Sequence, residues 1–390
     1  METIFHYIKN YGDKTFLEEE FNDIDNLVFS SLSYLDFDDI VPSSRKTISL
    51  QEAGHLFMKK YSYSEVKAFG FAQRDAYKVL KAIVDTKRYS SVLAYCYVYL
   101  SNDDKQFCAI TFRYEKKFIY VSFEGTDHLL SGWKEDFQMS YEFPVPSQAH
   151  AIWYLNKTIS IFDKNVIVGG HSKGGNLALI SSMYCFSFLR SKIKKIYNND
   201  GPGLREEEFL SKQYEKVKDR LVHFVPEVSY VGILLRSDKK TIVASSRKDI
   251  MSHAFSSWKV DDKKLVLAEQ SSVSASLEKS ILLWLEKHDD TKRKKVITSI
   301  FRALEKSNVD DIRDFISVKV ALEVVENLKS LDKETKELVH SFLEFNINYL
   351  WKNIAKKIDI QGRIDKLDSF VEDKKRKLIG SKKNKKNANF

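Results

Sequence analysis

The chain lacks the features that mark a secreted or membrane-spanning protein. Its 390 residues include only three cysteines, and Cys96, Cys108 and Cys185 form no C-x-x-C pair, so we expect buried free thiols in a reducing compartment. No apolar run approaches the roughly 18 residues that a membrane-spanning helix requires, and no basic segment stands ahead of an apolar one at the N-terminus. These absences predict a cytoplasmic location.

Motifs for metals and nucleotides are missing as well. The sequence has no cluster of histidines, cysteines and acids at metal-ligand spacing, and no G-x-x-x-x-G-K-[ST] phosphate-binding loop. We therefore expect neither a metal nor a cofactor. A hydrophobic fraction of 43% and an aromatic fraction of 13% indicate a folded protein. The length suffices for one large domain with a smaller one, or for two of middling size.

Acidic and basic residues nearly balance over most of the chain. Of the net charge of +9, eight positive charges lie in the segment from Lys374 to Lys386, which leaves +1 for residues 1–373. Because the body is close to neutral, we expect no specific binding of nucleic acid. The basic segment is predicted to be a disordered tail, with peripheral contact to an anionic surface as the alternative.

The most informative stretch is a glycine-rich turn between a predicted strand and a predicted helix. An apolar β-branched run over 166–168 leads into Gly170-His171-Ser172-Lys173-Gly174, and an amphipathic helix follows. This G-x-S-x-G context is typical of the elbow that holds a nucleophilic serine clear of a sheet. Ser172 is therefore the candidate nucleophile, and His171 is expected to point away from the site. The alternative is a glycine-rich turn with an incidental serine.

A second turn is a candidate partner of this elbow. Alternating residues over 91–124 predict a hairpin and a central strand, which runs into Glu124-Gly125-Thr126-Asp127. An oxyanion hole in an α/β-hydrolase takes one backbone N–H from the residue after the nucleophile and one from the loop after an earlier strand. Lys173 and Thr126 are the candidate donors, and the Thr126 hydroxyl is a further one. An ordinary turn is the alternative.

Two later residues are candidates for a base and an acid. Asp200 follows the strand predicted around Ile196, and His253 lies in a loop beyond the last predicted strand. A serine hydroxyl needs an imidazole to take its proton and a carboxylate to orient that imidazole. Because serine, acid and histidine come in the order used by α/β-hydrolases, we expect Ser172, Asp200 and His253 to form a triad. Glu227, after the next strand, is the alternative acid.

Four segments carry a family resemblance: Phe123 to Asp127, Gly132 to Asp136, Gly170 to Ala178, and Asp200 to Gly203. Together they resemble a bacterial family of lipase-like α/β-hydrolases, which is similar to the class 3, or fungal-type, lipases. The resemblance covers about residues 1–260. It implies an α/β-hydrolase fold and an ester substrate with an apolar acyl part.

Two positions depart from the class 3 pattern. Those lipases usually carry their acid in a D-x-V-P stretch, whereas the similar stretch here is His223-Phe224-Val225-Pro226. The acid role therefore falls to Asp200 or Glu227, or the triad is incomplete. Glu124 replaces the usual arginine of the oxyanion turn, which changes the local charge and keeps the backbone donor.

The order of the predicted elements indicates an α/β fold with a mostly parallel sheet and helices on both faces. We expect the α/β-hydrolase domain, with a helical N-terminal segment, over residues 1–265. From about Leu277 the pattern is helical, with apolar stripes such as Val296, Ile300 and Leu304. An α-helical region is therefore predicted over 266–373 and the basic tail over 374–390. These helices are expected to pack on one another or on the hydrolase body, with a lid or a partner-binding surface as the alternative.

The sequence thus predicts a serine hydrolase of the lipase or esterase type, which cleaves a small-molecule or lipid ester through an acyl-enzyme on Ser172. One alternative is a catalytically silent hydrolase-like scaffold that binds a partner or an anionic surface. Another is a thioesterase or peptidase that uses the same triad. The sequence gives no oligomeric state.

Overall fold

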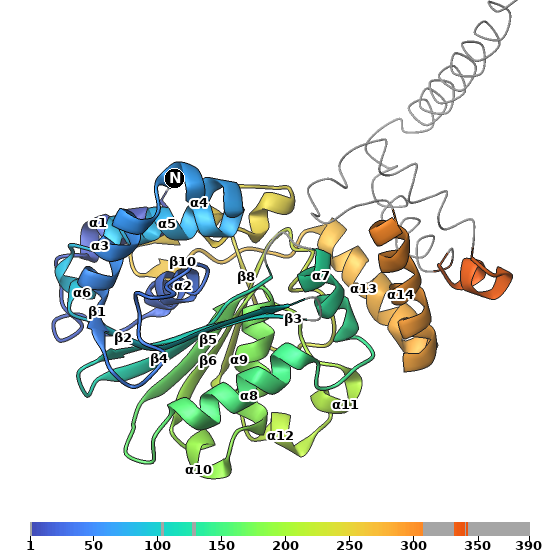
Figure 1. The fold of residues 1–390 in the computed structure, drawn as a ribbon. Helices are drawn as coiled ribbons and strands as arrows, with labels where there is room; N and C mark the ends of the chain where they lie inside the picture. The colour runs from blue at the N-terminus through green and yellow to red at the C-terminus, as the bar shows by residue number, and fades with distance from the viewer. Residues whose placement is uncertain (1, 103–104, 127–129, 307–330, 340, 342–390) are drawn as a thin grey trace, which may run out of the picture.

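A mixed eight-stranded sheet forms the centre of the fold (Figure 1). The computed structural model describes residues 2–102, 105–126, 130–306, 331–339 and 341. The strands lie side by side in chain order: β1 (Ile48–Ser49), β2 (Leu93–Asn102), β3 (Lys105–Tyr114), β4 (Phe118–Phe123), β5 (Val166–His171), β6 (Ile193–Asn199), β7 (Leu221–Pro226) and β8 (Lys240–Val243). The pairs from β1 to β4 are antiparallel, and those from β4 to β8 are parallel. Strands β9 (Val260–Asp261) and β10 (Lys264–Leu265) form a separate small pair.

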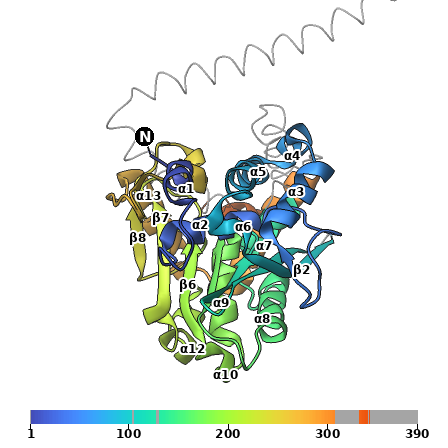
Figure 2. The same cartoon turned by 90° about the vertical axis from the view of Figure 1, so that its left-hand side faces the viewer.

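Helices cover both faces of the sheet. One face carries the N-terminal helices: α1 (Ile4–Tyr11), α2 (Asp23–Leu32), α3 (Leu50–Lys60), α4 (Tyr63–Phe69), α5 (Phe71–Ile83) and α6 (Lys87–Ser90). Figures 1 and 2 show α8 (Pro146–Thr158) and α9 (Lys173–Tyr184) on the opposite face. Shorter helical elements connect the later strands: α10 (Ser187–Arg190), α11 (Glu206–Phe209), α12 (Lys212–Glu215), η1 (Lys218–Arg220), η2 (Ile250–His253) and η3 (Phe255–Ser257). The predicted fold class is confirmed.

The central strands are buried on both sides because helices cover both faces. Every residue of β4 and of β5 is buried, as expected for parallel strands between two helical layers. Along β4 the side chains alternate between two cores: Tyr120 packs in the core under α2, and Val121 packs in the core under α9. The sheet therefore separates two apolar layers, and the carboxyl ends of its parallel strands meet at one edge.

A buried ion pair ties α2 to α6. Arg88 donates from Nη2 to Asp25 Oδ2 at 2.6 Å and from Nε to Asp25 Oδ1 at 2.8 Å, and both side chains have no exposed surface. The Tyr89 hydroxyl donates to the same carboxylate. Asp25 also accepts the backbone N–H of Asn22, which closes a capping box at the start of α2. The pair therefore holds the N-terminal layer together.

Three further helices stand beside this body: α7 (Leu130–Gln138), α13 (Ser272–Lys287) and α14 (Asp290–Lys306). Helix α14 packs against α7, where the rings of Phe301 and Phe137 lie 5.8 Å apart between their centroids. The first turn of α13 is attached to the loop after β7. Ser274 Oγ accepts a hydrogen bond from the N–H of Ser229 and donates one to the Ser229 carbonyl. Helices α13 and α14 confirm the helical prediction up to residue 306, whereas most of the predicted helical region beyond it and the tail over 374–390 lie outside the described residues. Within the described part, no helix is both long and apolar enough to cross a membrane.

Arg88→Ala should be strongly destabilising, because it leaves the Asp25 charge buried without its partner. Removal of one member of such a pair costs about 3–5 kcal/mol. The control is Arg113→Ala, whose 3.1 Å pair with Asp163 is partly exposed, so a loss below about 1 kcal/mol is expected. Urea unfolding of both variants measures the difference, and equal losses would contradict the structural role of the buried pair.

Candidate active site

Ser172 stands on a strained turn between β5 and α9. Its backbone has φ 58° and ψ −134°, a conformation that side-chain-bearing residues rarely adopt. The turn packs tightly on the end of β4: a Cβ placed on Gly174 would lie 2.1 Å from the carbonyl oxygen of Phe123, so no side chain fits there. The Ser172 N–H donates to the Asn199 carbonyl at 2.9 Å. Strand, strained serine and helix therefore form the geometry of a nucleophile elbow.

Asp200 and His253 meet at the ends of their segments. Asp200, the residue after β6, is completely buried, and its Oδ2 lies 2.7 Å from His253 Nδ1. Its other oxygen accepts the Ser229 hydroxyl at 2.6 Å and the Gly232 N–H at 3.0 Å. Burial raises the pKa of Asp200, and the hydrogen bonds from His253, Ser229 and Gly232 oppose this rise. A carboxylate at this distance fixes the His253 tautomer with the proton on Nδ1, which leaves Nε2 as the basic nitrogen.

The His253 loop is fixed by its own hydrogen bonds and by His171. Trp258 is fully buried and donates from Nε1 to the Ser252 carbonyl at 2.9 Å. His171 Nε2 lies 2.7 Å from the His253 carbonyl, and the two imidazole rings are 4.4 Å apart between centroids. The loop that carries His253 is thus attached to the residue directly before Ser172.

The prediction that His171 points away from the site was wrong. Side chains alternate along β5, so His171 shares the face of Ile167, which packs under α2. On that face the Tyr34 hydroxyl lies 2.9 Å from His171 Nδ1. Burial, with repulsion from His253, lowers the pKa of His171 well below its ordinary range. The neutral ring therefore accepts from Tyr34 and donates to the His253 carbonyl. The period of two along the strand was the signal for this direction.

Glu227 lies in a different environment from Asp200. Its Oε1 accepts the Ser245 N–H at 3.0 Å, and its Oε2 forms an ion pair with Lys248. Burial raises the pKa of Glu227, but the hydrogen bonds from Lys248 and Ser245 outweigh it and the net shift is downward. The structure therefore brings Asp200, and not Glu227, to His253.

His223, which replaces the aspartate of the D-x-V-P pattern, supports the Asp200 turn. Its Nε2 lies 3.0 Å from the carbonyl of Gly201, the residue after Asp200, and its Nδ1 lies 2.8 Å from the Ser237 hydroxyl. Burial lowers the pKa of His223 to about 3, so the ring is neutral. It donates to the Gly201 carbonyl and holds the chain where the acid side chain begins.

The turn after β4 lies directly against the elbow. A Cβ on Gly125 would lie 2.6 Å from the His171 carbonyl oxygen and 2.8 Å from Ser172 Cβ. The candidate donors of Thr126 and Lys173 thus flank the serine. The Thr126 hydroxyl, named above as a further donor, instead donates to Asp136 Oδ2 at 2.5 Å.

Helix α7 places two buried carboxylates behind these candidate donors. Lys173 Nζ lies 3.2 Å from Glu135 Oε2, with both side chains almost fully buried, and it also donates to the Gln106 carbonyl. Burial lowers the pKa of Lys173, but the charges of Glu135 and Asp136 outweigh this and raise it overall. The Asp136 Oδ1 atom is buried and has no hydrogen-bond partner within the described residues. In the sequence, Glu135 and Asp136 stand out only as part of the segment from Gly132 to Asp136 that carries the family resemblance.

The family comparison covers the part of the chain that builds this site. Residues 83–302, more than half of the chain, match the model of the Mbeg1-like family. The chain belongs to the Mbeg1-like family. The predicted resemblance to a lipase-like family is thereby confirmed. No protein with a curated description matches the chain. The crystal structure of M37 lipase is similar at 15% identity over 53% of this chain and 68% of that one, with a TM-score of 0.32.

In this Mbeg1-like chain, Asp136 is expected to make stability depend on pH. Burial raises the pKa of Asp136 from 3.8 to about 7, against the opposing charge of Lys173 and the hydrogen bond from Thr126. In the unfolded state Asp136 loses its proton near pH 4, whereas in the folded state it keeps the proton up to about pH 7. The free energy of unfolding therefore falls as the pH rises from 5 through 7. Between pH 5 and pH 8 this loss amounts to about 2–3 kcal/mol.

The isosteric Asp136→Asn variant has no such proton to release, so its free energy of unfolding should change less between pH 5 and pH 8 than that of the wild type. Urea unfolding of both proteins at the two pH values measures this double difference. An identical change in both proteins would show that Asp136 does not titrate in this range.

Proposed function

We propose that the protein is a serine hydrolase that cleaves carboxylic esters through an acyl-enzyme on Ser172. The observation that carries this proposal is the hydrogen bond between Asp200 and His253. The loop that holds His253 is attached through His171 to the strained elbow of Ser172. Membership of a lipase-like family favours an ester over other acyl substrates.

Each group then has one task. His253 Nε2 takes the proton of the Ser172 hydroxyl while the serine oxygen attacks the ester carbonyl, and Asp200 stabilises the imidazolium that forms. The carbonyl oxygen becomes an oxyanion and accepts hydrogen bonds from the backbone N–H groups of Lys173 and Thr126. His253 returns the proton to the leaving alkoxide, and the alcohol departs. Water, activated by the same imidazole, then releases the carboxylic acid and restores Ser172.

A fluorophosphonate probe tests the nucleophile directly. The wild type should label at one residue, and Ser172→Ala should abolish labelling, because the probe needs an activated serine. Ser182→Ala is the matched control: this buried serine lies on α9, the helix that follows Ser172, donates to the Ala178 carbonyl and should not affect labelling. An unlabelled wild type, beside a control esterase that labels, would overturn the proposal and favour a catalytically silent scaffold.

Two carboxylate variants test the assignment of the acid. Asp200→Asn should reduce kcat by about 10⁴-fold, because the amide favours the wrong imidazole tautomer. Glu227→Gln should leave kcat within a few fold of the wild type, since its partners are Ser245 and Lys248. Hydrolysis of a p-nitrophenyl ester measures both. Near-normal activity of Asp200→Asn would remove Asp200 from the triad.

A further inference from the structure

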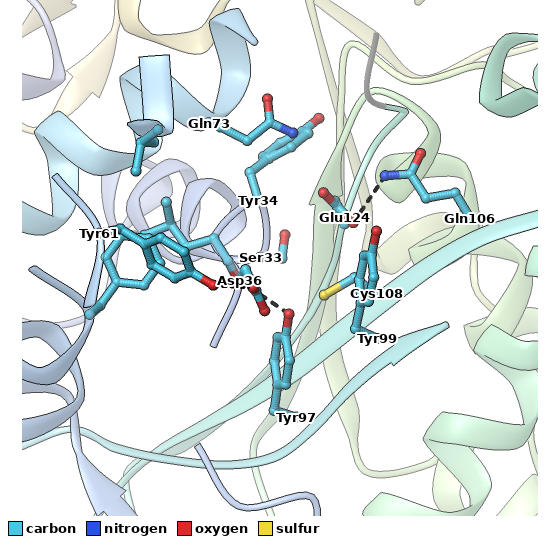
Figure 3. Close-up of a pocket in the computed structure, with 13 residues that line it drawn as sticks. Ser33, Tyr34, Asp36, Tyr61, Gln73, Tyr97, Tyr99, Gln106, Cys108 and Glu124 are labelled. Carbon is cyan, nitrogen blue, oxygen red and sulfur yellow. Dashed lines mark hydrogen bonds between the residues drawn. The ribbon is translucent and has the colours of Figure 1, made fainter. Parts of the chain in front are cut away.

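A cavity of about 290 Å³ lies beside the elbow, lined by residues of the N-terminal helical segment and of strands β2 and β3. Aromatic rings make up much of its wall: Tyr34, Phe57, Tyr61, Tyr97 and Tyr99 (Figure 3). Tyr34, Phe57 and Tyr97 are almost completely buried, whereas Tyr99 is about half exposed. The cavity therefore runs from an exposed rim to a buried aromatic end.

The charges on this wall have one sign. Glu124, the residue directly after β4, lines the cavity and is 5% exposed. Asp36 lies on the exposed side of the cavity, and its Oδ2 accepts a hydrogen bond from the Tyr61 hydroxyl at 2.5 Å. The 13 lining residues include no lysine, arginine or histidine. Lys173 reaches the carbonyl of Gln106, another lining residue, but its ammonium group is paired with Glu135. The lining thus combines aromatic faces with two carboxylates.

Two residues join this cavity to the proposed site. Tyr34 lines the cavity and bonds to His171, the residue before Ser172. Glu124 lines the cavity and directly precedes Gly125, whose backbone packs against Ser172. If the ester carbonyl of a substrate lies at Ser172, the cavity is next to it and can hold the group on one side of the ester bond.

We propose that the cavity binds a cationic group of the substrate, a quaternary or protonated ammonium, and that the enzyme prefers esters that carry such a group near the scissile bond. The inference rests on the proposed function, since it names the substrate class of the same site. Aromatic faces attract a cation through their ring quadrupoles, and recognition of quaternary ammonium groups is a known use of such walls.

The buried position of Glu124 distinguishes this ligand from a plain acyl chain. The Glu124 carboxylate accepts a hydrogen bond from Gln106 Nε2 at 3.4 Å. An apolar chain packed against this carboxylate offers the charge no electrostatic attraction and removes its remaining contact with water, which is unfavourable. A cation in the same place gains an opposite charge in a medium of low dielectric constant. Asp36, on the exposed side, adds attraction for a cation that approaches from solvent. Glu124 stands where the class 3 pattern has arginine, so the charge at this position is reversed.

The first test compares two esters of equal shape and different charge. Butyrylcholine and 3,3-dimethylbutyl butyrate differ in one atom, the quaternary nitrogen that replaces a carbon. For the wild type, kcat/KM should be about tenfold higher for the choline ester. Glu124→Gln keeps the volume and removes the charge, so it should bring the ratio close to one. Glu208→Gln is the control, because Glu208 is also buried but pairs with Arg205 away from the cavity.

The second test separates failure of this inference from failure of the proposed function. Binding of tetramethylammonium to Ser172→Ala is measured by titration calorimetry, with and without the additional Glu124→Gln change, and needs no catalysis. Binding that Glu124→Gln weakens about tenfold supports the cationic site even if neither ester is hydrolysed. Equal turnover of both esters, a preference for the neutral ester, or absence of tetramethylammonium binding to Ser172→Ala would overturn it.

Discussion

The first turn of α9 touches the end of β4 so closely that no side chain fits between them. This contact at Gly174 fixes the depth at which Ser172 leaves the sheet. Because the turn after β4 then has no room to move away, Gly125 packs on the serine and Glu124 is directed to the wall of the aromatic cavity. The candidate nucleophile, the candidate oxyanion donors and the proposed cation site thus depend on one packing constraint between two backbones.

Much of the fold is readable from the sequence because the central strands are apolar on both faces and turns of glycine, asparagine and aspartate follow them. The N-terminal layer is different. Helix α2 buries Asn26 and Ser30 against Tyr120 and Asn199, and Asp25 against Arg88. In the sequence these polar residues look like the start and the solvated face of a helix. Their partners are 63 to 173 residues away, so no local pattern reveals that they are buried.

In the candidate site, too, some features follow from local sequence patterns and others depend on partners far away in the chain. Serine, acid and histidine could be proposed from their places after successive strands, because parallel strands deliver their carboxyl ends to one edge. The sequence favoured Asp200 but left Glu227 open as the alternative acid, since both follow neighbouring strands. It depends on the later loops: Ser229 and Gly232 surround Asp200, whereas Ser245 and Lys248 engage Glu227. The burial of Glu135 was equally hidden, because its partner Lys173 lies 38 residues further along the chain.

The packing of α14 on α7 has a consequence for the wall of the site. Phe137 and Trp133 of α7 contact the apolar face of α14, while Glu135 and Asp136 of the same helix face Lys173 and Thr126. Helix α7 therefore lies between α14 on one side and the candidate oxyanion turn on the other. A chain cut at residue 265 would lose that outer support and would expose two aromatic side chains to water. Helix α14 thus supports α7 from outside, and α7 in turn contacts the residues on either side of the candidate oxyanion site through Lys173 and Thr126.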